Sequence, residues 1–291
     1  MPSLIDIRRR IRSVKNTEQI TKALKMVSAA KLRRAQDRVI AARPYVAMLG
    51  KVLANVAAAV EANAAEAADG GSGENALLAR RPERRILLVL ITSDTGKAGA
   101  FNTNLIKAAQ RFMAERPDAA VTLETAGRKG RDFFRKHGAT ISGEYIGMAK
   151  APYADIAAIA HKAMETFRTG ETDAVYLLFN GFKSVMAQTL TLARVLPAET
   201  PKSAEPIDYI FDQPPAEILG DLLPKYVEMA FYGALLESTA AEHGARMTAM
   251  DAATTNAAEM IDKLTLYMNR VRQASITREI IEVVSGAAGA E

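Results

Sequence analysis

The chain contains no cysteine and no tryptophan among its 291 residues, and aromatic residues make up only 6% of it. Without cysteine there is no disulfide framework, no thiolate metal site and no cysteine nucleophile. The scarcity of aromatic residues, together with abundant alanine, favours close packing of helices over a β-sandwich or a β-barrel.

Long apolar runs are also missing, because the longest strong run covers only residues 86–91. A helix that crosses a bilayer needs about 20 apolar residues. The N-terminus passes directly into a charged helical pattern, MPSLIDIRRRIRSV, without the apolar region or cleavage site of a signal peptide. We therefore expect a soluble protein without a membrane span.

Positive charge is concentrated at one end of the chain. Residues 1–43 hold 12 Lys and Arg residues against 3 Asp and Glu residues, whereas the net charge of the whole chain is only +5. The remainder is therefore slightly acidic. Charge segregated in this way marks a surface that meets a partner.

The N-terminal region has the pattern of a helix that continues to about residue 62. Its first apolar residues are spaced by three and four residues, at Leu4, Ile7, Ile11 and Val14. The stripe breaks at residues 16–19 and resumes out of phase at Ile20, Leu24 and Val27. Such a skip changes a supercoil locally, and Pro44 removes one helical hydrogen bond.

The C-terminal region predicts a second long helix, since no proline follows Pro224. About 60 helical residues span roughly 90 Å, which exceeds the size of a compact domain of this length. The helix must therefore protrude and pair with another. A heptad seam is predicted at Met250, Ala253, Ala257, Met260, Leu264, Tyr267, Val271 and Ala274. With a helix at each end, the simplest arrangement is a long antiparallel coiled coil.

Strands and helices alternate between these two helices, which predicts a small Rossmann-like α/β domain with a mostly parallel sheet. Strands are expected at residues 85–92, 121–125, 140–145, 174–179 and 183–196, and helices at 103–115, 130–136 and 154–168. The last two strands are predicted to pair through a turn at Asn180-Gly181. The predicted fold class is thus α/β, in four parts: a coiled-coil helix at 1–62, a flexible linker at 63–83, the α/β domain at 84–215 and a coiled-coil helix at 216–291.

The loop SDTGKAGAFN, residues 93–102, lies where a phosphate-binding loop would lie. Gly96-Lys97 is followed by Ala98 rather than by Ser or Thr, and Gly96 with Gly99 gives only half of a dinucleotide-binding motif. A tight turn is the simpler interpretation. Asp94 is a candidate catalytic residue because ligands gather at the carboxyl ends of parallel strands, but no base, nucleophile or metal motif accompanies it.

Two other kinds of site are weighed and disfavoured. The three histidines, His137, His161 and His243, are far apart in sequence and none has the spacing of a metal site. The basic first helix has the charge to bind phosphates, yet it lacks aromatic interleaving and any helix-turn-helix or zinc spacing. The residues alone leave open a coiled-coil nucleic-acid or scaffold protein and an α/β enzyme with helical extensions.

Three motifs resemble those of ATP synthase gamma subunits. Residues 13–36, SVKNTEQITKALKMVSAAKLRRAQ, resemble the N-terminal signature of the family, and residues 245–287 resemble its C-terminal signature. The loop at 93–102 is similar to the family's glycine-rich loop. Thr95 and Lys97 stand where the family usually has a basic residue and Leu, and Leu24 where Met is common. The resemblance covers the whole chain in the right order.

The resemblance implies a non-catalytic rotor subunit, present once per complex. The coiled coil would lie on the axis of a hexamer of alpha and beta subunits, and the α/β domain beside an epsilon-type subunit and a ring of c subunits. An inhibitor subunit is a further partner. Rotation of the ring by protons would drive ATP synthesis. Nucleotide and magnesium would bind to alpha and beta, so no cofactor, metal or nucleic acid is expected on this chain, which would be peripheral to the cytoplasmic face of the bacterial inner membrane.

Individual site residues are implied by the same resemblance. Arg272 and Gln273 match a pair that hydrogen-bonds a catch loop of the beta subunit. The torque-sensitive stretch is matched by Thr277 and Glu279, and the region near the beta levers by Leu24 and Lys25. Contacts with the epsilon-type subunit and the c-ring are implied at Tyr209, Phe211 and Asp212.

Overall fold

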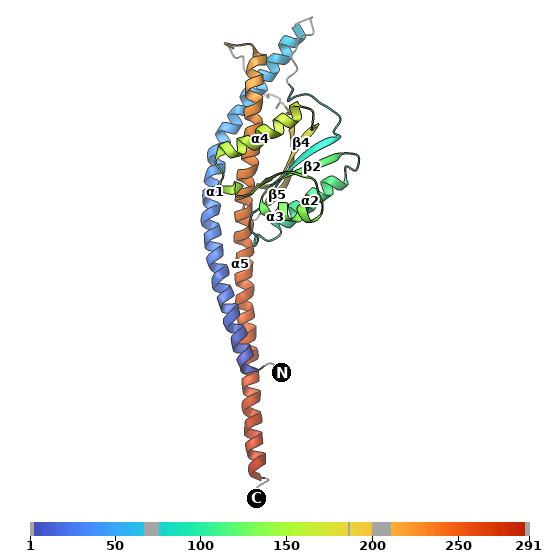
Figure 1. The fold of residues 1–291 in the computed structure, drawn as a ribbon. Helices are drawn as coiled ribbons and strands as arrows, with labels where there is room; N and C mark the ends of the chain where they lie inside the picture. Colours follow the sequence, from blue (N-terminus) through green and yellow to red (C-terminus); the bar gives the residue numbers. More distant parts are fainter. Residues whose placement is uncertain (1–2, 67–75, 186, 200–210, 289–291) are drawn as a thin grey trace. The chain divides into compact units, whose positions relative to one another are not determined.

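A computed structural model describes residues 3–66, 76–185, 187–199 and 211–288. The chain divides into two compact units. Residues 1–29 and 246–291 form one, called here the coil unit, and residues 30–245 form the other, the sheet unit. Two long helices, α1 (Leu4–Glu66) and α5 (Pro215–Ala288), contribute to both units, and Figure 1 shows them with the other elements.

The sheet unit is built on five strands in the order β3-β2-β1-β4-β5. Their bounds are β1 Arg85–Ile91, β2 Ala120–Ala126, β3 Ile141–Tyr145, β4 Ala174–Phe182 and β5 Gln188–Leu196. The first four strands run parallel, and β5 pairs antiparallel with β4. β1 is buried from Ile86 to Ile91 because it lies inside the sheet with helices over both faces.

Helices cover the two faces of the sheet with separate cores. On one face, α2 (Phe101–Ala114) and α3 (Arg128–Lys136) pack against Leu88, Leu123 and Leu178. On the other face, α4 (Tyr153–Arg168) packs with parts of α1 and α5 around residues such as Leu53 and Val227. A 3-10 turn, η1 (Met148–Lys150), precedes α4. The predicted α/β class with a mostly parallel sheet is confirmed.

Two details of the sheet unit differ from the prediction. The predicted turn at Asn180-Gly181 is wrong, because β4 continues through it and Asn180 pairs with Leu190 across the ladder. Asn180 is buried in that ladder, so its backbone is used in the sheet. The turn instead follows Phe182, where the N–H groups of Lys183 and Ser184 both donate to the carbonyl of Ala187.

One stretch of α1 also departs from the expectation about membrane spans. Within residues 4–60, α1 contains an 18-residue window with a mean hydropathy of 1.3, and 33% of that window is buried inside the structure. Length and composition alone would let it cross a bilayer. Core helices pass the same test, and Leu53, Val56 and Ala57 of α1 belong to the core of the sheet unit.

The coil unit pairs α1 and α5 antiparallel. The Thr254 hydroxyl donates to the Thr21 hydroxyl at 2.8 Å, and the Lys25 ammonium lies 2.6 Å from the Asp251 carboxylate. Advancing along α1 from Thr21 to Lys25 therefore means moving backward along α5. The same register places Leu4 opposite Val271, and both side chains are half-buried.

The predicted phase break in α1 is wrong. The side chains that are buried or half-buried in the coil unit keep an unbroken heptad spacing, with Leu4, Ile11, Glu18 and Lys25 on one line and Ile7, Val14, Thr21 and Ser28 on the other. The out-of-phase apolar residues Ile20 and Val27 point outward and are 57% and 50% exposed. Polar residues thus fill the seam where the sequence suggested a break.

The predicted seam of α5 is partly correct. Met250, Ala253, Ala257, Leu264 and Val271 are buried or half-buried as predicted. Met260, Tyr267 and Ala274 are exposed, and the second line lies one residue further on, at Thr254, Ile261, Met268 and Ser275. The apolar pattern of the sequence does not indicate this line, because two of its members, Thr254 and Ser275, are polar.

The division into four domain ranges stays a prediction. The helices run further than the sequence ranges suggested, since α1 reaches Glu66, and residues 67–75 of the predicted linker lie outside the described part of the chain. Both units include parts of both long helices.

Candidate functional site

The loop after β1 closes on itself through Ser93 and Asn102. The Ser93 backbone N–H donates to Asn102 Oδ1 at 3.0 Å, and Asn102 Nδ2 donates to Ser93 Oγ at 2.8 Å. Ser93 Oγ also donates to the carbonyl of Thr95 at 2.6 Å. Lys97 has a φ of 66°, a left-handed conformation that fits a tight turn. This loop is therefore shaped by its own hydrogen bonds.

Asp94 joins the ends of three parallel strands. Its Oδ1 accepts the N–H of Arg128 at 3.0 Å, at the start of α3, and its Oδ2 accepts the N–H of Gly147 at 2.9 Å, after β3. Both oxygens are thus used to hold neighbouring loops together. The expectation that Asp94 is catalytic has no support in this geometry, which gives the carboxylate a structural task.

The N-terminus of α3 has no free N–H groups for a phosphate. Besides Arg128, the N–H of Lys129 donates to the carbonyl of Ser93 at 3.1 Å, and the N–H of Gly130 donates to Thr92 Oγ1 at 2.9 Å. A helix N-terminus binds anions through such groups, and here the chain itself occupies them. Gly127 is required beside them, because its φ is 122° and a Cβ atom would lie 2.2 Å from the Thr92 carbonyl oxygen.

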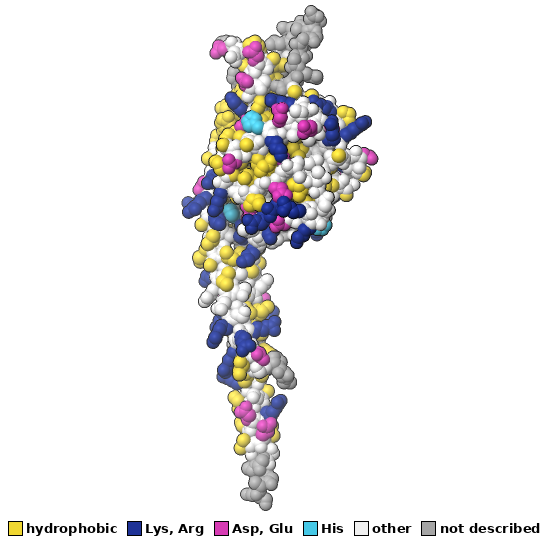
Figure 2. Space-filling view, in the orientation of Figure 1, with side chains coloured by type: hydrophobic (Ala, Val, Ile, Leu, Met, Phe, Trp, Pro, Cys, Tyr) yellow, Lys and Arg dark blue, Asp and Glu magenta, His cyan; other side chains and the backbone are white. Residues whose placement is uncertain are grey.

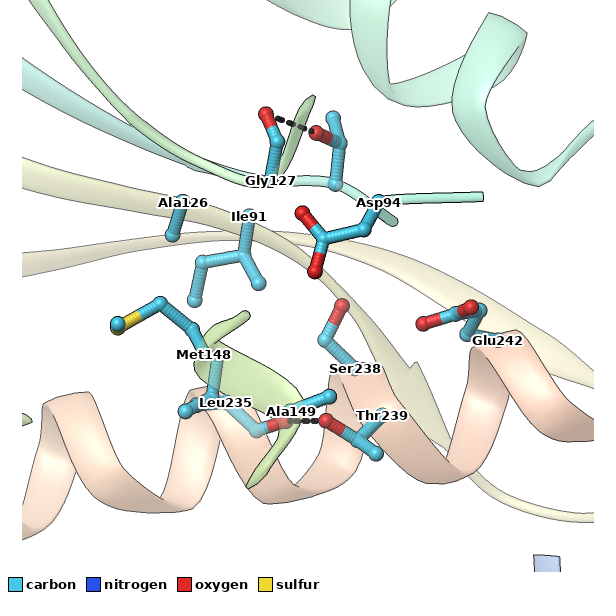
Figure 3. A pocket seen from close by; sticks show the side chains of 11 residues that line it. Ile91, Asp94, Ala126, Gly127, Met148, Ala149, Leu235, Ser238, Thr239 and Glu242 are labelled. Atoms are coloured by element: carbon cyan, nitrogen blue, oxygen red, sulfur yellow. Dashed lines mark hydrogen bonds between the residues drawn. The ribbon is translucent and has the colours of Figure 1, made fainter. Parts of the chain in front are cut away.

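A small cavity lies beside Asp94, between the sheet and α5 within the sheet unit (Figure 3). Ser238, Thr239 and Glu242 of α5 line its far side, and the Ser238 side chain lies across from Asp94. The lining includes no histidine, lysine or arginine. A serine and a carboxylate without a base to join them do not form a nucleophilic triad.

Two of the three histidines contact other groups of the protein. His137 stacks on Phe133 with ring centroids 4.0 Å apart, and its Nδ1 lies 2.7 Å from the Phe133 carbonyl oxygen. His161 Nε2 lies 3.0 Å from a carboxylate oxygen of Glu228. Among the residues that the structure describes, no group of three potential ligands converges on one point.

A buried glutamate of the sheet, Glu124, is paired with a lysine of the helix α4. Glu124 of β2 is 1% exposed, and its Oε1 accepts from the Lys162 ammonium of α4 at 2.7 Å. Burial, followed by the nearby Glu124 carboxylate, raises the pKa of the Tyr145 phenol above its usual range. Gly143 leaves room for this group, because a Cβ atom there would lie 2.8 Å from the Tyr145 hydroxyl. The cluster ties α4 to the sheet.

The residues matched to the beta levers lie in the coil unit. Leu24 is half-buried, and Lys25 is paired with Asp251 across the two helices. The outward surface at this level includes apolar residues, since Ile20, Met26 and Val27 are all exposed, beside the exposed Lys22. The structure thus brings Lys25 into the helix pair and leaves neighbouring apolar side chains outside.

The predicted catch-loop pair and torque-sensitive stretch lie near the end of α5. Arg272, Gln273, Thr277 and Glu279 are all exposed. The Thr277 hydroxyl donates to the Gln273 carbonyl at 2.9 Å, and the Ser275 hydroxyl donates to Glu279 Oε1 at 3.2 Å. These bonds lie along the helix, so they leave the Arg272 and Gln273 side chains facing outward.

The last part of α5 presents apolar side chains to solvent. Every side chain from residue 276 to residue 285 is exposed, and Figure 2 shows hydrophobic side chains along this stretch. The apolar residues are Ile276, Ile280, Ile281, Val283 and Val284. An exposed apolar surface of this kind marks an interaction site.

Of the three residues matched to epsilon and c-ring contacts, two are described. Phe211 is half-buried and packs against the core of the sheet unit, and Asp212 is exposed. Tyr209 lies outside the described residues. Two further exposed apolar residues, Leu190 and Leu192 on β5, were not singled out from the sequence, because alternation within a predicted strand does not say which strand lies at the edge.

Comparisons with known proteins agree with one another. A family model described as ATP synthase matches residues 3–289. An ATP synthase gamma chain of Solibacter usitatus is 72% identical over 292 residues and one of Pelotomaculum thermopropionicum is 48% identical over 295 residues, each match covering 100% of both chains.

Solved structures share the fold. A chain of the Euglena gracilis mitochondrial ATP synthase rotor matches with a TM-score of 0.64 at 19% identity, covering 94% of this chain and 98% of that one. A chain from an OSCP/F1/c-ring structure of the same enzyme gives a TM-score of 0.65 at 18% identity, covering 98% of this chain and 94% of that one. Likeness at this level of identity concerns the fold of the chain.

Proposed function

Because this chain belongs to the ATP synthase gamma chain family, we propose that its helix pair is the shaft that couples rotation of a c-ring to catalysis in an alpha and beta hexamer. The chain is a non-catalytic central-stalk subunit of the ATP synthase complex.

The observation that carries the proposal is the antiparallel helix pair of the coil unit. The buried and half-buried side chains from Leu4 to Ser28 of α1 follow one register with α5, and the described side chains of α5 beyond Ser275 are all exposed. Paired continuous helices resist twisting better than a jointed chain. An exposed single helix with apolar residues suits the end of a shaft that a protein sleeve surrounds.

We assign the contact with the beta catch loop to Arg272 and Gln273. Their side chains are exposed, so the guanidinium and the amide have donors available for a partner. The torque-sensitive role goes to Thr277 and Glu279 in the next turn.

At the level of the beta levers, the coil unit supports different roles for Lys25 and Leu24. Lys25 is engaged by Asp251, so we assign it a contact within the helix pair rather than a contact with the levers. Leu24 is half-buried beside the exposed apolar residues Ile20 and Val27. Contact with the levers at this level is then mainly apolar, and such contacts are not fixed to one partner orientation because they lack direction.

The sheet unit is proposed to meet the epsilon-type subunit and the c-ring through Phe211, Asp212 and the neighbouring Tyr209. One copy of the chain serves each complex, with an inhibitor subunit as a further partner, at the cytoplasmic face of the bacterial inner membrane. Nucleotide and magnesium are held by alpha and beta. The α3 N–H groups that a nucleotide would need are already bonded within the chain, which supports the absence of a cofactor here.

The test is an ATPase assay on the isolated chain and on the chain mixed with alpha and beta subunits. The isolated chain is expected to have no activity, and the mixture to hydrolyse ATP faster than alpha and beta alone. Turnover by the isolated chain, or a mixture no faster than its components, would contradict the proposal.

A further inference from the structure

β5 is an edge strand whose outer side is unpaired within the described part of the chain. It pairs only with β4, from Gln188 to Leu196, and no other strand of the described sheet lies beside it. Residues 188–194 are exposed or half-buried along their length. Every second backbone N–H and carbonyl of an edge strand points away from the sheet, which makes the edge a template for another strand.

The usual protections of an edge strand are weak here. β5 contains no proline and no lysine, and its single charged residue, Arg194, is already engaged by Glu83 and Glu199. The ladder is irregular only near Val175, which pairs with Leu196 at the far end of the strand. Proteins normally blunt a free edge with charge, proline or a bulge, and the stretch from Gln188 to Leu192 has none of these.

An apolar groove runs beside the same edge. Leu190 and Leu192, each 42% exposed, form one wall of it, and the helix α2 forms the other. Leu178 of β4 and Phe112 of α2 line it between these walls. Because side chains alternate along a strand, Leu190 and Leu192 project from the same face, toward α2.

The rim of the groove carries a positive charge on α2. Arg111 is paired with Glu115 at 2.7 Å, whereas Lys107 forms no ion pair with any described residue. A partner that fills the groove would place an acidic side chain near Lys107 with favourable charge complementarity.

We propose that β5 accepts one extended strand from another subunit of the ATP synthase, which adds to the sheet as a sixth strand. The incoming strand carries apolar side chains at alternate positions and an acidic residue opposite Lys107. A strand added about 4.8 Å from β5 places those apolar side chains over Leu190 and Leu192 and into the groove, so a single partner satisfies both the open edge and the apolar surface. The inference rests on the proposed function, since it takes the partner from the same complex.

Residue-resolved hydrogen exchange tests the proposal on the full chain, first alone and then in the assembled ATP synthase. Strand addition protects the outward N–H groups of β5 in an alternating pattern. We expect those amides between Gln188 and Arg194 to exchange about tenfold more slowly, or slower still, in the complex. Equal exchange rates in the two states would overturn the inference.

A variant with Leu190→Glu and Leu192→Glu tests the groove. We expect it to keep the thermal midpoint of the isolated chain, because both positions are exposed, and to lose the slowing of β5 exchange in the complex. Ile146→Glu is the matched control, since Ile146 is 41% exposed and follows β3 at the opposite edge of the sheet. Retained slowing in the double variant, or its loss in the control, would count against the groove.

The two proposals fail in different ways. A chain that assembles with alpha and beta and stimulates ATP hydrolysis, but whose β5 amides exchange equally fast before and after full assembly, would overturn only the added strand. A chain that does not assemble at all would overturn the proposed function and the strand partner with it.

Discussion

The Lys25 ammonium and the Asp251 carboxylate lie 2.6 Å apart across the coil unit, one turn of α1 from the hydrogen bond between Thr21 and Thr254. These two contacts join the same pair of helices and fix one register between them. Because the register decides which residues face outward, it also decides which surface the coil unit offers to a partner.

The ion pair should contribute little to stability by itself. The side chains of Lys25 and Asp251 are 42% and 56% exposed, and exposed pairs contribute at most about 1 kcal/mol. A double-mutant cycle with Lys25→Ala and Asp251→Ala, measured by thermal unfolding of the full chain, should give a coupling energy below that limit. Lys25→Ala should likewise leave ATP-driven proton pumping by the assembled complex nearly unchanged. A large loss of pumping would show that Lys25 meets a partner subunit directly.

The hydroxyl pair of Thr21 and Thr254 leads to a second prediction about the stability of the helix pair. Thr21 is buried, and its hydroxyl donates to the Glu18 carbonyl, so it is satisfied within its own helix. Replacing Thr21 and Thr254 together with Val removes both polar partners and keeps their shape, which is often neutral or stabilising. We expect the double variant to unfold at an equal or higher temperature, and the single Thr21→Val and Thr254→Val variants to show whether the pair is additive. A fall of more than about 1 kcal/mol for the double variant would mean that the hydroxyl pair holds the helices together.

The same hydroxyls explain how far the sequence could predict the coil unit. The existence and direction of the helix pair followed from length, the absence of proline and the heptad spacing. The exact residues of the seam could not be predicted in this way, because the prediction assumed that the buried side chains are the apolar ones. The hydroxyls of threonine and serine can donate to carbonyls of their own helix, as Ser28 does to Leu24. These small side chains can therefore occupy the seam, while the apolar Ile20 and Val27 lie outside it.

The sheet unit was predicted more closely, since its buried strands are continuous apolar runs. The error at Asn180-Gly181 arose because that dipeptide favours a turn locally, while pairing with Leu190 and Thr189 keeps it extended. The structural role of Asp94 was also out of reach of sequence, because its partners Arg128 and Gly147 lie 34 and 53 residues away.

Asp94→Ala should destabilise the chain without a direct effect on catalysis in the complex. The substitution removes a carboxylate that accepts two backbone N–H groups, and each lost bond to a charged acceptor costs about 1.5–3 kcal/mol. Asp94→Asn keeps one acceptor oxygen and should fall between the variant and the parent in chemical denaturation. If Asp94 were catalytic, Asn and Ala would reduce the ATPase rate of the assembled complex equally while leaving stability alone.

Arg272→Ala with Gln273→Ala should impair coupling and spare the fold. Both side chains are exposed, and surface substitutions usually change stability by no more than about 0.5 kcal/mol. We expect an unchanged melting temperature for the isolated chain and reduced ATP-driven proton pumping by the complex. Arg270→Ala is a suitable control, since Arg270 is also exposed on the same stretch of α5. Normal ATP synthesis with the double variant would remove the catch contact from the proposed mechanism.

Asp173 supplies a prediction about pH. The Arg85 guanidinium donates to Asp173 Oδ1 at 2.9 Å and the Arg85 backbone N–H donates to Oδ2 at 2.9 Å, and the side-chain bond is the main reason that the pKa of this carboxyl lies below its usual range. A carboxyl with a lower pKa in the folded chain than in the unfolded one stabilises the fold above the unfolded pKa, near 4. That contribution is lost as the pH falls through the depressed folded pKa. The difference in unfolding free energy between the parent and Asp173→Asn should therefore be constant near neutral pH and shrink below about pH 4. Urea titrations at a series of pH values measure it, and a difference that grows toward low pH would mean that the carboxyl is not stabilised as an anion by Arg85.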